Sequence, residues 1–553
     1  MTRHERTRVA LEALALALLT ALPLLAYFVY LFHHPIERFA LSGDYAGLEL
    51  ATRYVPSGRT LLGPYSRFGF SHPGPLYFYV LAPVYALWGS TSTGIFAGAC
   101  AVNVISVMTI VAAMRVATTR MHAVAVALVL LGWLGAFGDA CAIPWNPLVV
   151  VLPLIAFLVL AALVCNGWWQ ALPFAVLAGS FAGETHLSTI PAVVGITVAT
   201  AAIVVVRVRR GHPMGRTGKV YALAGLAVLV FAVAPPLLEE LVTPDGNITK
   251  LAHFFASRKE PMRAFASAVS DWTLATSWLP DRLFAGSLMV EPYPAVMASD
   301  APLATLPSGA VRTTLVLAVA AAAASVLAVR RRDYPSVALL GLGVLMSVLS
   351  ALSLRAIVGV NFIYLLFWTT AATTVMWMGV LAAFGTALAA RIEKGAPATS
   401  LASIARVVWP LALVALLVMA AHVTSLQRGY LARETLRPPV DAVERELYGA
   451  IRTRVTETGE TPVFHAHGAW HYGLGFLLEA SKDHIDARVV DRDRWILGRQ
   501  SRGTEGVAHP LHVYVDVPDA RVFVRDCLEK LTTVGTTVIY TSPVDVESCP
   551  AKP

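Results

Sequence analysis

The feature that most constrains this chain is a series of eleven long apolar segments. They lie at about 9–32, 92–114, 122–138, 148–165, 169–183, 189–206, 220–241, 311–329, 335–353, 360–389 and 404–422. A helix that crosses a membrane needs about 20 mostly apolar residues. The composition agrees, because only 14% of the 553 residues are charged, against about a quarter in a soluble domain. The sequence therefore predicts a polytopic α-helical membrane protein with about 11 transmembrane helices.

The short basic clusters between these segments predict the orientation. If the N-terminus is cytoplasmic, each cluster falls on the cytoplasmic side, where positive charge gathers in membrane proteins. The clusters are Arg115 with Arg120, then 207–219, 330–332 and 391–406. This assignment accounts for the net charge of +8 without a nucleic-acid partner. We expect a multi-pass protein of the cytoplasmic (inner) membrane. Its first apolar run is too long for a signal peptide and is predicted to be a retained anchor.

One further apolar stretch, at 75–89, is too short to span. Its length is that of an interfacial helix, so we expect an outer juxtamembrane helix there. The outer side then holds loops 33–91 and 242–310 and a C-terminal tail. Loop 242–310 has aromatic and basic residues in the pattern of an amphipathic helix on the membrane surface.

The tail differs in composition from the rest of the chain. Short β-rich runs such as LHVYVDV alternate with amphipathic helical runs such as AWHYGLGFLLEASK, which predicts a small α/β domain. The expected domains are a transmembrane domain at 1–424 and an extracytoplasmic α/β domain at 425–553. Cys527 and Cys549 both lie in the tail, where an oxidising compartment permits a disulfide. Two free thiols are the alternative.

Three histidines of the tail suggest a metal cluster at first sight. These are His465, His467 and His471, of which the first two would share one face of a strand. No cysteine or acid is spaced to complete a zinc site with them. We therefore expect no metal there.

The first outer loop concentrates the residues typical of a catalytic site. It carries Asp44 in a short polar turn and Glu49 about one helical turn later. The basic residues Arg59 and Arg67 follow, and then His72.

The end of this loop carries a family resemblance. The run His72-Pro73-Gly74-Pro75-Leu76-Tyr77 and the acid after the first span resemble the GT-C superfamily of polyprenyl-phosphate-dependent glycosyltransferases. In that superfamily the first extracytoplasmic loop carries a catalytic acid and often ends in a His-Pro-Pro-Leu-Tyr-like run, from which the glycine here departs. The layout of many spans with an outer C-terminal domain is also similar. Within this superfamily the chain resembles the bacterial protein mannosyltransferases, aminoarabinose transferases and arabinofuranosyltransferases.

The chemistry of glycosyl transfer independently assigns roles in this loop. Transfer with inversion needs one carboxylate to take the proton of the acceptor hydroxyl, and a phosphate leaving group needs cations. Asp44 is the candidate base, with a helix N-cap as the alternative, while Glu49 is a candidate acceptor contact or a solvated helix face. Arg59, Arg67 and His72 are candidates for donor phosphate binding. Headgroup contacts and, for the histidine, shaping of the turn are the alternatives.

Three more outer positions add candidates. By the same resemblance, Asp139 or Asn146 would bind the acceptor or a metal, and Trp145 offers a flat face for a sugar; a capped interfacial turn is the alternative. Glu184 and His186 lie at the outer end between two spans, where ionisable residues are costly and functional by default. Arg355 suits a lipid phosphate, with snorkelling to headgroups as the alternative. A divalent cation, Mg²⁺ or Mn²⁺, bound by oxygen ligands is compatible with these residues.

The function expected from these observations is a membrane glycosyltransferase. It would transfer a sugar, arabinofuranose or mannose, from a polyprenyl-phosphate donor to an envelope glycan, lipoglycan or protein outside the cytoplasm, among membrane lipids as its surroundings. The alternatives are a lipid-linked sugar flippase or transporter and a non-catalytic envelope-assembly subunit. The charges concentrate in outer loops and the centres of the spans are apolar, which favours chemistry at the interface over translocation.

Overall fold

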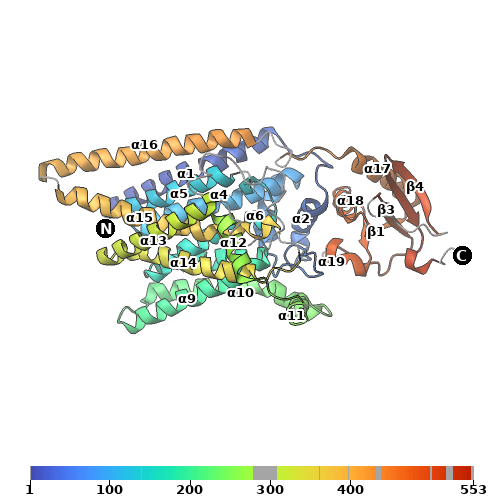
Figure 1. The fold of residues 1–553 in the computed structure, drawn as a ribbon. Helices are drawn as coiled ribbons and strands as arrows, with labels where there is room; N and C mark the ends of the chain where they lie inside the picture. The colour runs from blue at the N-terminus through green and yellow to red at the C-terminus, as the bar shows by residue number, and fades with distance from the viewer. Residues whose placement is uncertain are drawn as a thin grey trace. The chain divides into compact units, whose positions relative to one another are not determined.

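The structure is a computed structural model that describes residues 2–138, 140–258, 260–277, 308–359, 362–395, 398–430, 437–497, 501–518 and 527–549. The chain, drawn as a ribbon in Figure 1, forms two compact units. The first unit comprises Met1–Tyr30, Ala99–Ala234 and Ala256–Leu436. The second comprises Leu31–Gly98, Pro235–Phe255 and Arg437–Pro553. The second unit therefore contains the first predicted outer loop and the tail from Arg437 onward.

Ten helices among the described residues are long and apolar enough to cross a membrane. They are α1 (Arg3–His33), α4 (Ser92–Ala117), α5 (Arg120–Phe137), α6 with α7 (Asn146–Val149 and Val151–Cys165), α9 (Ile190–Arg209), α10 (Arg216–Val242), α13 (Ser308–Arg331), α14 (Tyr334–Leu354), α15 (Thr370–Gly395) and α16 (Ala398–Tyr430). The segment expected at 169–183 forms α8 (Leu172–Thr185), which has 14 residues. At 1.5 Å per residue this helix is only about 21 Å long, so it falls short of the length of a span. The ten long apolar helices make the chain a multi-pass membrane protein, as predicted.

Helix α7 forms the core of the first unit. All 15 of its residues are buried, as expected for a helix that is apolar all round. It packs against α8, α9, α14 and α15. Helices α14 and α15 cross closely, because a Cβ atom at Gly343 would lie 2.6 Å from the side chain of Met376 and one at Gly379 would lie 2.7 Å from Leu340. Small residues allow such close approach between membrane helices.

Polar contacts gather the N-terminal helix and two basic loops at one end of the first unit. Glu12 of α1 accepts hydrogen bonds from the Nε atoms of Arg115 at 3.1 Å and Arg120 at 2.9 Å. His122 lies 2.9 Å from Asp333, in the loop after the cluster at 330–332. These contacts place the predicted cytoplasmic clusters at 115–120 and 330–332 at the same end of the bundle as the N-terminus.

The loop after the first span contains two helices. These are α2 (Gly43–Arg53) and α3 (Leu76–Leu87). The 12 residues of α3 match the short apolar stretch that was expected to form a juxtamembrane helix. Both helices belong to the second unit.

The prediction of an amphipathic surface helix in loop 242–310 was wrong in part. The structure has two helices there, α11 (Asn247–Ala256) and α12 (Phe265–Thr276), and 278–307 lies outside the described residues. The expected helix is interrupted between Ala256 and Phe265, and Pro261 lies in this break, where it disfavours helical backbone at Glu260. Helix α12 is buried against α14, with Asp271 2% exposed, rather than lying on a surface.

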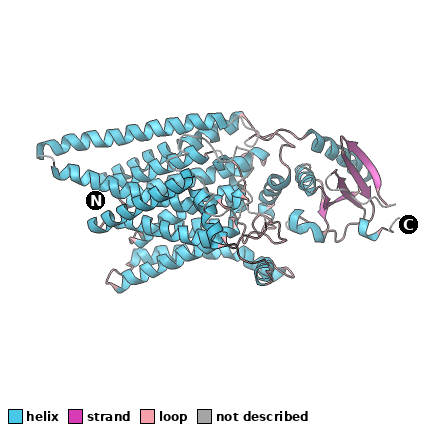
Figure 2. Ribbon diagram, in the orientation of Figure 1, coloured by secondary structure: helices cyan, strands magenta, loops and turns pink. Residues whose placement is uncertain are grey.

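The tail forms the predicted α/β domain, and all the strands of the described chain are there (Figure 2). Its sheet has the order β2-β1-β3-β5-β4. The strands are β1 (Thr461–Gly468), β2 (Arg488–Val489), β3 (Pro510–Asp516), β4 (Glu529–Val534) and β5 (Thr537–Ser542). Strand β1 is parallel to β2 and β3, and β5 is antiparallel to β3 and β4. Helices α17 (Ala442–Thr458) and α18 (Trp470–Lys482) pack on this domain, and Cys527 and Cys549 form a disulfide.

A buried carboxyl group lies where α17 meets α18. Glu444 is fully buried, and both carboxyl oxygens lack a hydrogen-bond partner among the described residues. Burial, reinforced by Asp441 and Glu479, raises the pKa of Glu444 to about 9. A Cβ atom at Gly475 of α18 would lie 2.0 Å from this carboxyl group, so the glycine makes room for it. Glu444 is therefore a neutral acid at pH 7.

We expect Glu444→Gln to stabilise the protein increasingly as the pH rises. The pKa of Glu444 is raised in the folded state, so the protonated carboxyl group contributes fully to the free energy of unfolding below about pH 4.5. This contribution is lost as the pH rises towards 9. Between pH 5 and 8 the advantage of the glutamine variant should grow by about 4 kcal/mol. Melting temperatures of the detergent-solubilised protein at both pH values measure this difference. Glu446→Gln, an exposed change on the same helix, is the control, and an advantage that does not change with pH would contradict the prediction.

Candidate active site

The candidate base lies in the first turn of α2. The N-cap residue is Ser42, and Asp44 follows inside the helix, so Asp44 is not the N-cap that the alternative interpretation proposed. Gly43 has a φ of +52°, and a Cβ atom there would lie 3.6 Å from the Trp470 ring and 3.5 Å from His471. The left-handed backbone conformation favours glycine at this position. The chain enters α2 at Gly43, next to the side chains of Trp470 and His471 in α18.

A tyrosine that the sequence analysis missed contacts the carboxylate. The hydroxyl group of Tyr65 donates a hydrogen bond to Oδ1 of Asp44. Tyr65 pairs with Ser71 across a tight turn that Gly69 closes with a φ of +84°. The ring of Tyr65 also lies edge-on to Trp470, with 5.9 Å between the ring centroids. The turn thus holds the hydroxyl group of Tyr65 against Asp44, next to the ring of Trp470 from the tail.

The turn is anchored by an asparagine of α11. The side chain of Asn247 accepts a hydrogen bond from the Ser71 amide at 2.8 Å and donates one to its carbonyl oxygen at 2.9 Å. Asn247 is fully buried, and its own amide donates to Glu239 at 2.9 Å. The rings of Phe68 and Phe70 pack on Phe254 of the same helix. These contacts join the turn to α11.

Of the four arginines in the loop, the two that were predicted to bind the donor phosphate stack on aromatic rings. The guanidinium group of Arg59 lies 4.1 Å from the ring centroid of Tyr54, and its Nε donates to Ser57 at 3.0 Å. Arg67 is exposed at the tip of the turn, 4.9 Å from the ring centroid of Phe68. Stacking on a ring leaves the edge of a guanidinium group available for further hydrogen bonds. Their assignment to a donor phosphate stays a prediction.

His72 lies in the paired backbone at the base of the turn. Its amide donates to the carbonyl oxygen of Pro64 at 2.7 Å, and its carbonyl oxygen accepts from Gly63 at 3.0 Å. Burial lowers the pKa of His72 to about 4. The imidazole is therefore neutral at pH 7, so it can offer a phosphate a hydrogen bond but no positive charge.

Glu49 belongs to a buried ionic cluster between α2 and α18. Its carboxylate is fully buried and lies 3.2 Å from Nζ of Lys482. It also accepts hydrogen bonds from Tyr85 at 3.0 Å and Ser92 at 2.8 Å. Lys482 in turn lies 3.1 Å from Glu479. Both oxygens of Glu49 are engaged, which excludes the solvated helix face and favours a structural role over the predicted acceptor contact.

Two further arginines of the loop bind the end of α18. Arg38 forms ion pairs with Glu479 and, at 2.8 Å, with Asp483. Arg53 donates to the hydroxyl group of Ser481 at 3.0 Å and to its carbonyl oxygen at 3.2 Å. Together with the Glu49–Lys482 pair, these contacts fasten the tail to the loop that carries Asp44. We call this set the α2–α18 clamp; its members are Arg38, Glu49, Arg53, Glu479, Ser481, Lys482 and Asp483.

The first unit contains a second group of predicted residues. The side chain of Asn146 donates to the carbonyl oxygen of Thr185 at 3.1 Å, which brings it beside Glu184 and His186. Those two side chains are only 7% and 2% exposed. Trp145 faces Tyr364, with 4.7 Å between the ring centroids. The structure thus brings together the predicted residues at 145–146 and 184–186, whereas Asp139 lies outside the described residues.

Arg355 lies close to this second group. Ser353 donates to the carbonyl oxygen of Ser188 at 2.8 Å, which joins the end of α14 to the segment after α8. Nε of Arg355 donates to the carbonyl oxygen of Arg263 at 3.1 Å, and Arg263 forms an ion pair with Asp271 at 2.6 Å. Arg263 carried no signal in the sequence, because its partner Asp271 is buried in α12. Arg355 thus uses one edge of its guanidinium group to hold the segment before α12.

The fold resembles that of a protein of known structure. The chain matches the crystal structure of ArnT from Cupriavidus metallidurans bound to undecaprenyl phosphate with a TM-score of 0.51 at 14% sequence identity, over 96% of this chain and 98% of that one. It matches ArnT from the same organism in the apo state with a TM-score of 0.52 at 13% identity, over 95% and 97% of the two chains. No protein-family model matches the chain, and no curated protein matches its sequence. The likeness extends over both units and shows a shared fold.

Proposed function

We propose that the protein is a GT-C membrane glycosyltransferase that uses a polyprenyl-phosphate sugar as donor. The observation that carries the proposal is the carboxylate of Asp44, fixed by Tyr65 in the first loop of a chain with the ArnT fold. One of the similar structures is described as bound to undecaprenyl phosphate, which supports a lipid phosphate as the donor class. We propose arabinofuranose or mannose as the sugar, and an envelope glycan, lipoglycan or protein as the acceptor.

In the proposed reaction, Asp44 acts as general base. It takes the proton of an acceptor hydroxyl group while that oxygen attacks the anomeric carbon of the donor. The bond from this carbon to the phosphate oxygen breaks, and polyprenyl phosphate leaves with the electron pair. Attack from the side opposite the leaving group inverts the configuration of the sugar. The negative charge on the leaving phosphate requires cations close by.

The other candidates take roles around this step. Arg59, Arg67 and Arg355 are proposed to bind the donor phosphate, with His72 as a neutral hydrogen-bond donor. The proposed acceptor contacts are Asp139, Trp145, Asn146, Glu184 and His186.

A divalent cation, Mg²⁺ or Mn²⁺, stays part of the proposal, because buried carboxylates such as Glu184 are oxygen ligands suited to it. Loss of transfer in EDTA that is restored by Mg²⁺ or Mn²⁺ tests this requirement.

The proposed location is the cytoplasmic membrane with the tail outside. The contacts of Glu12 with Arg115 and Arg120 support it, because the basic clusters and the N-terminus then share the cytoplasmic side. A cysteine-reactive membrane-impermeant probe on a Thr458→Cys variant in intact cells tests the orientation. Labelling before lysis is expected, and labelling only after lysis would contradict it.

Transfer itself is tested with purified protein in nanodiscs. Radiolabelled polyprenyl-phosphoryl arabinose and mannose are presented with pooled envelope glycans or envelope proteins as acceptors. We expect label in the acceptor with one of the two donors. A lipid-linked sugar flippase would instead move the intact donor between leaflets of a liposome, and an assembly subunit would do neither.

We expect Tyr65→Phe to lower kcat about 10-fold, since a hydrogen bond to a charged group contributes about 1.5–3 kcal/mol. The lost hydrogen bond stabilises the carboxylate form of Asp44, so the variant should also shift the acidic limb of the pH–rate profile to higher pH. The KM for the donor should change little. A pH profile of kcat that is the same in both proteins would show that Tyr65 has only a structural role.

A further inference from the structure

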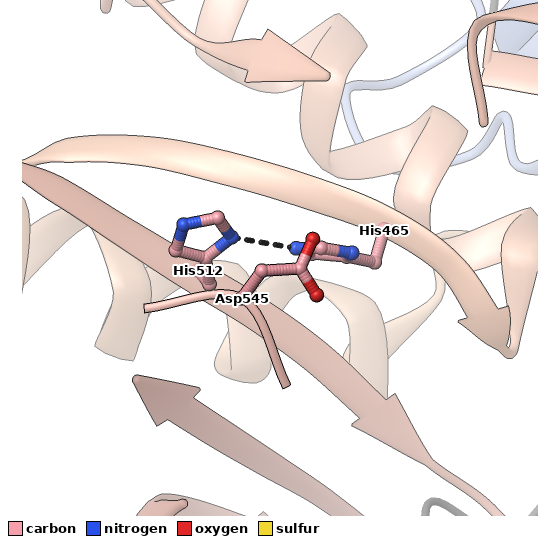
Figure 3. Close-up of side chains that lie close together, drawn as sticks. All are labelled: His465, His512 and Asp545. Atoms are coloured by element: carbon pink, nitrogen blue, oxygen red, sulfur yellow. Dashed lines mark hydrogen bonds between the residues drawn. The ribbon is translucent and has the colours of Figure 1, made fainter. Parts of the chain in front are cut away.

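A cluster of two histidines and an aspartate lies in the tail, outside the proposed active site. Nε2 of His465 on β1 lies 2.8 Å from Nδ1 of His512 on β3 (Figure 3). The carboxylate of Asp545, in the segment after β5, lies beside this pair, and one ligand atom from each residue lies within 4.8 Å of the others. Both histidines are buried, with 1% and 7% of their surface exposed. The neighbours of His465 in this cluster are thus His512 and Asp545, and not the histidines closest to it in sequence.

The register of the sheet explains why the histidines meet. Phe464 of β1 pairs with Val513 of β3 in parallel register, and successive side chains of a strand point to opposite faces. His465, His512 and Tyr514 therefore share one face of the sheet. The ring of Tyr514 stacks on His465 with 4.2 Å between the centroids. This stacking fixes the plane of the imidazole.

The aspartate is held in place by several contacts. Arg492 donates to the two oxygens of Asp545 at 2.8 and 3.0 Å, and the hydroxyl group of Tyr514 donates at 3.4 Å. The same hydroxyl group accepts from the amide of Val546 at 2.8 Å. Four residues beyond the aspartate, Cys549 is joined to Cys527 by the disulfide. All three groups are therefore positioned before any ligand arrives.

We propose that His465, His512 and Asp545 form a binding site for a divalent transition metal of the Zn²⁺ class. Two imidazole nitrogens with one carboxylate suit Zn²⁺, whereas Mg²⁺ and Ca²⁺ prefer oxygen ligands only. The side chain of Asp545 is 20% exposed, which gives water access to a fourth position. In a small domain, such a site would add stability by joining β1, β3 and the chain end.

The site needs only small movements to accept the ion. At zinc–nitrogen distances of about 2.0–2.1 Å, two ligand nitrogens of a tetrahedral site lie about 3.4 Å apart. The 2.8 Å between the two histidines must therefore open by a few tenths of an ångström on each side. Nη2 of Arg492 lies 3.3 Å from Nδ1 of His465 and must give up that contact. The N–H group at Nδ1 of His465 would then donate to Asp493, whose Oδ2 lies 3.9 Å away. A carboxylate that accepts from the other ring nitrogen orients a metal-bound imidazole.

The first test measures bound metal in the full-length protein. It is purified with a histidine-free affinity tag, stripped with a chelator, exposed to Zn²⁺ and desalted, and its zinc is counted by mass spectrometry. About one zinc per chain is expected in the wild type and in His509→Gln, an exposed histidine of the same domain. His465→Asn with His512→Gln should retain none. Equal retention in all three proteins, or none in the wild type, would overturn the proposal.

The second test needs no variant, so it does not depend on the folding of one. The stripped wild type is melted with and without Zn²⁺, and its visible spectrum is recorded with Co²⁺ in place of zinc. A rise in melting temperature and the absorption bands of tetrahedral Co²⁺ are expected. If neither is seen, the cluster is a metal-free hydrogen-bonded pair. The proposal is independent of sugar transfer, so a failed transfer assay leaves it unaffected.

Discussion

Asp44→Asn is expected to lower the turnover of sugar transfer by about 10²–10⁴-fold, the usual contribution of a general base. The amide keeps the size of the side chain and can still contact Tyr65, so folding and donor binding should survive. It cannot take a proton from the acceptor. Radiolabel transfer in nanodiscs measures turnover, and retention of labelled donor on the protein measures binding.

Glu37→Gln is the matched control for this substitution. Glu37 lies in the same loop and is exposed, so the change removes one negative charge without touching the site. Full activity is expected from this variant. Transfer that persists in Asp44→Asn at the wild-type rate would leave the class of enzyme standing and assign the base to another carboxylate, such as Glu184.

Lys482→Met is expected to destabilise the protein by roughly 3–5 kcal/mol, because it leaves the buried carboxylate of Glu49 without its cation, whereas Glu479 keeps its ion pair with Arg38. Glu49 and Glu479 are 0% and 1% exposed, and both lie within 3.2 Å of this lysine. The loss should appear as a lower melting temperature and faster proteolysis of the tail. Lys530→Met, an exposed lysine of the same domain, should melt like the wild type.

A second variant separates a broken ion pair from a general packing defect. Glu49→Gln with Lys482→Met removes both charges of the pair and should recover much of the lost stability, since replacing a buried pair by neutral groups is often close to neutral. If the double variant is no more stable than Lys482→Met, the Glu49–Lys482 contact does not contribute in the way described. Because the α2–α18 clamp holds the loop of Asp44, activity should follow stability in this series.

Those features of the fold that depend on local sequence could be predicted. The membrane helices were found because each carries its own run of apolar residues, and α3 was recognised as too short. The α/β character of the tail followed from its alternating runs. The shortness of α8 and the break before α12 were missed, because hydropathy alone places helix ends poorly.

The candidate site was only partly predictable, because its contacts join distant parts of the chain. Asp44 could be found from its position after the first span, but its partner Tyr65 carried no sequence signal. The burial of Glu49 could not be predicted, since the lysine that neutralises it comes from the far end of the sequence. His465 was recognised as unusual, yet its partners become visible only when β1 and β3 pair.

The most direct test of the central claim counts both products of the proposed reaction. Wild-type protein is incubated with a labelled polyprenyl-phosphate sugar and an acceptor, and free polyprenyl phosphate and glycosylated acceptor are quantified together. Glycosyl transfer predicts equal amounts of the two products, and almost none of either with Asp44→Asn. Donor that stays intact with every sugar and acceptor tried, or that only changes leaflet, would contradict the assignment as a glycosyltransferase.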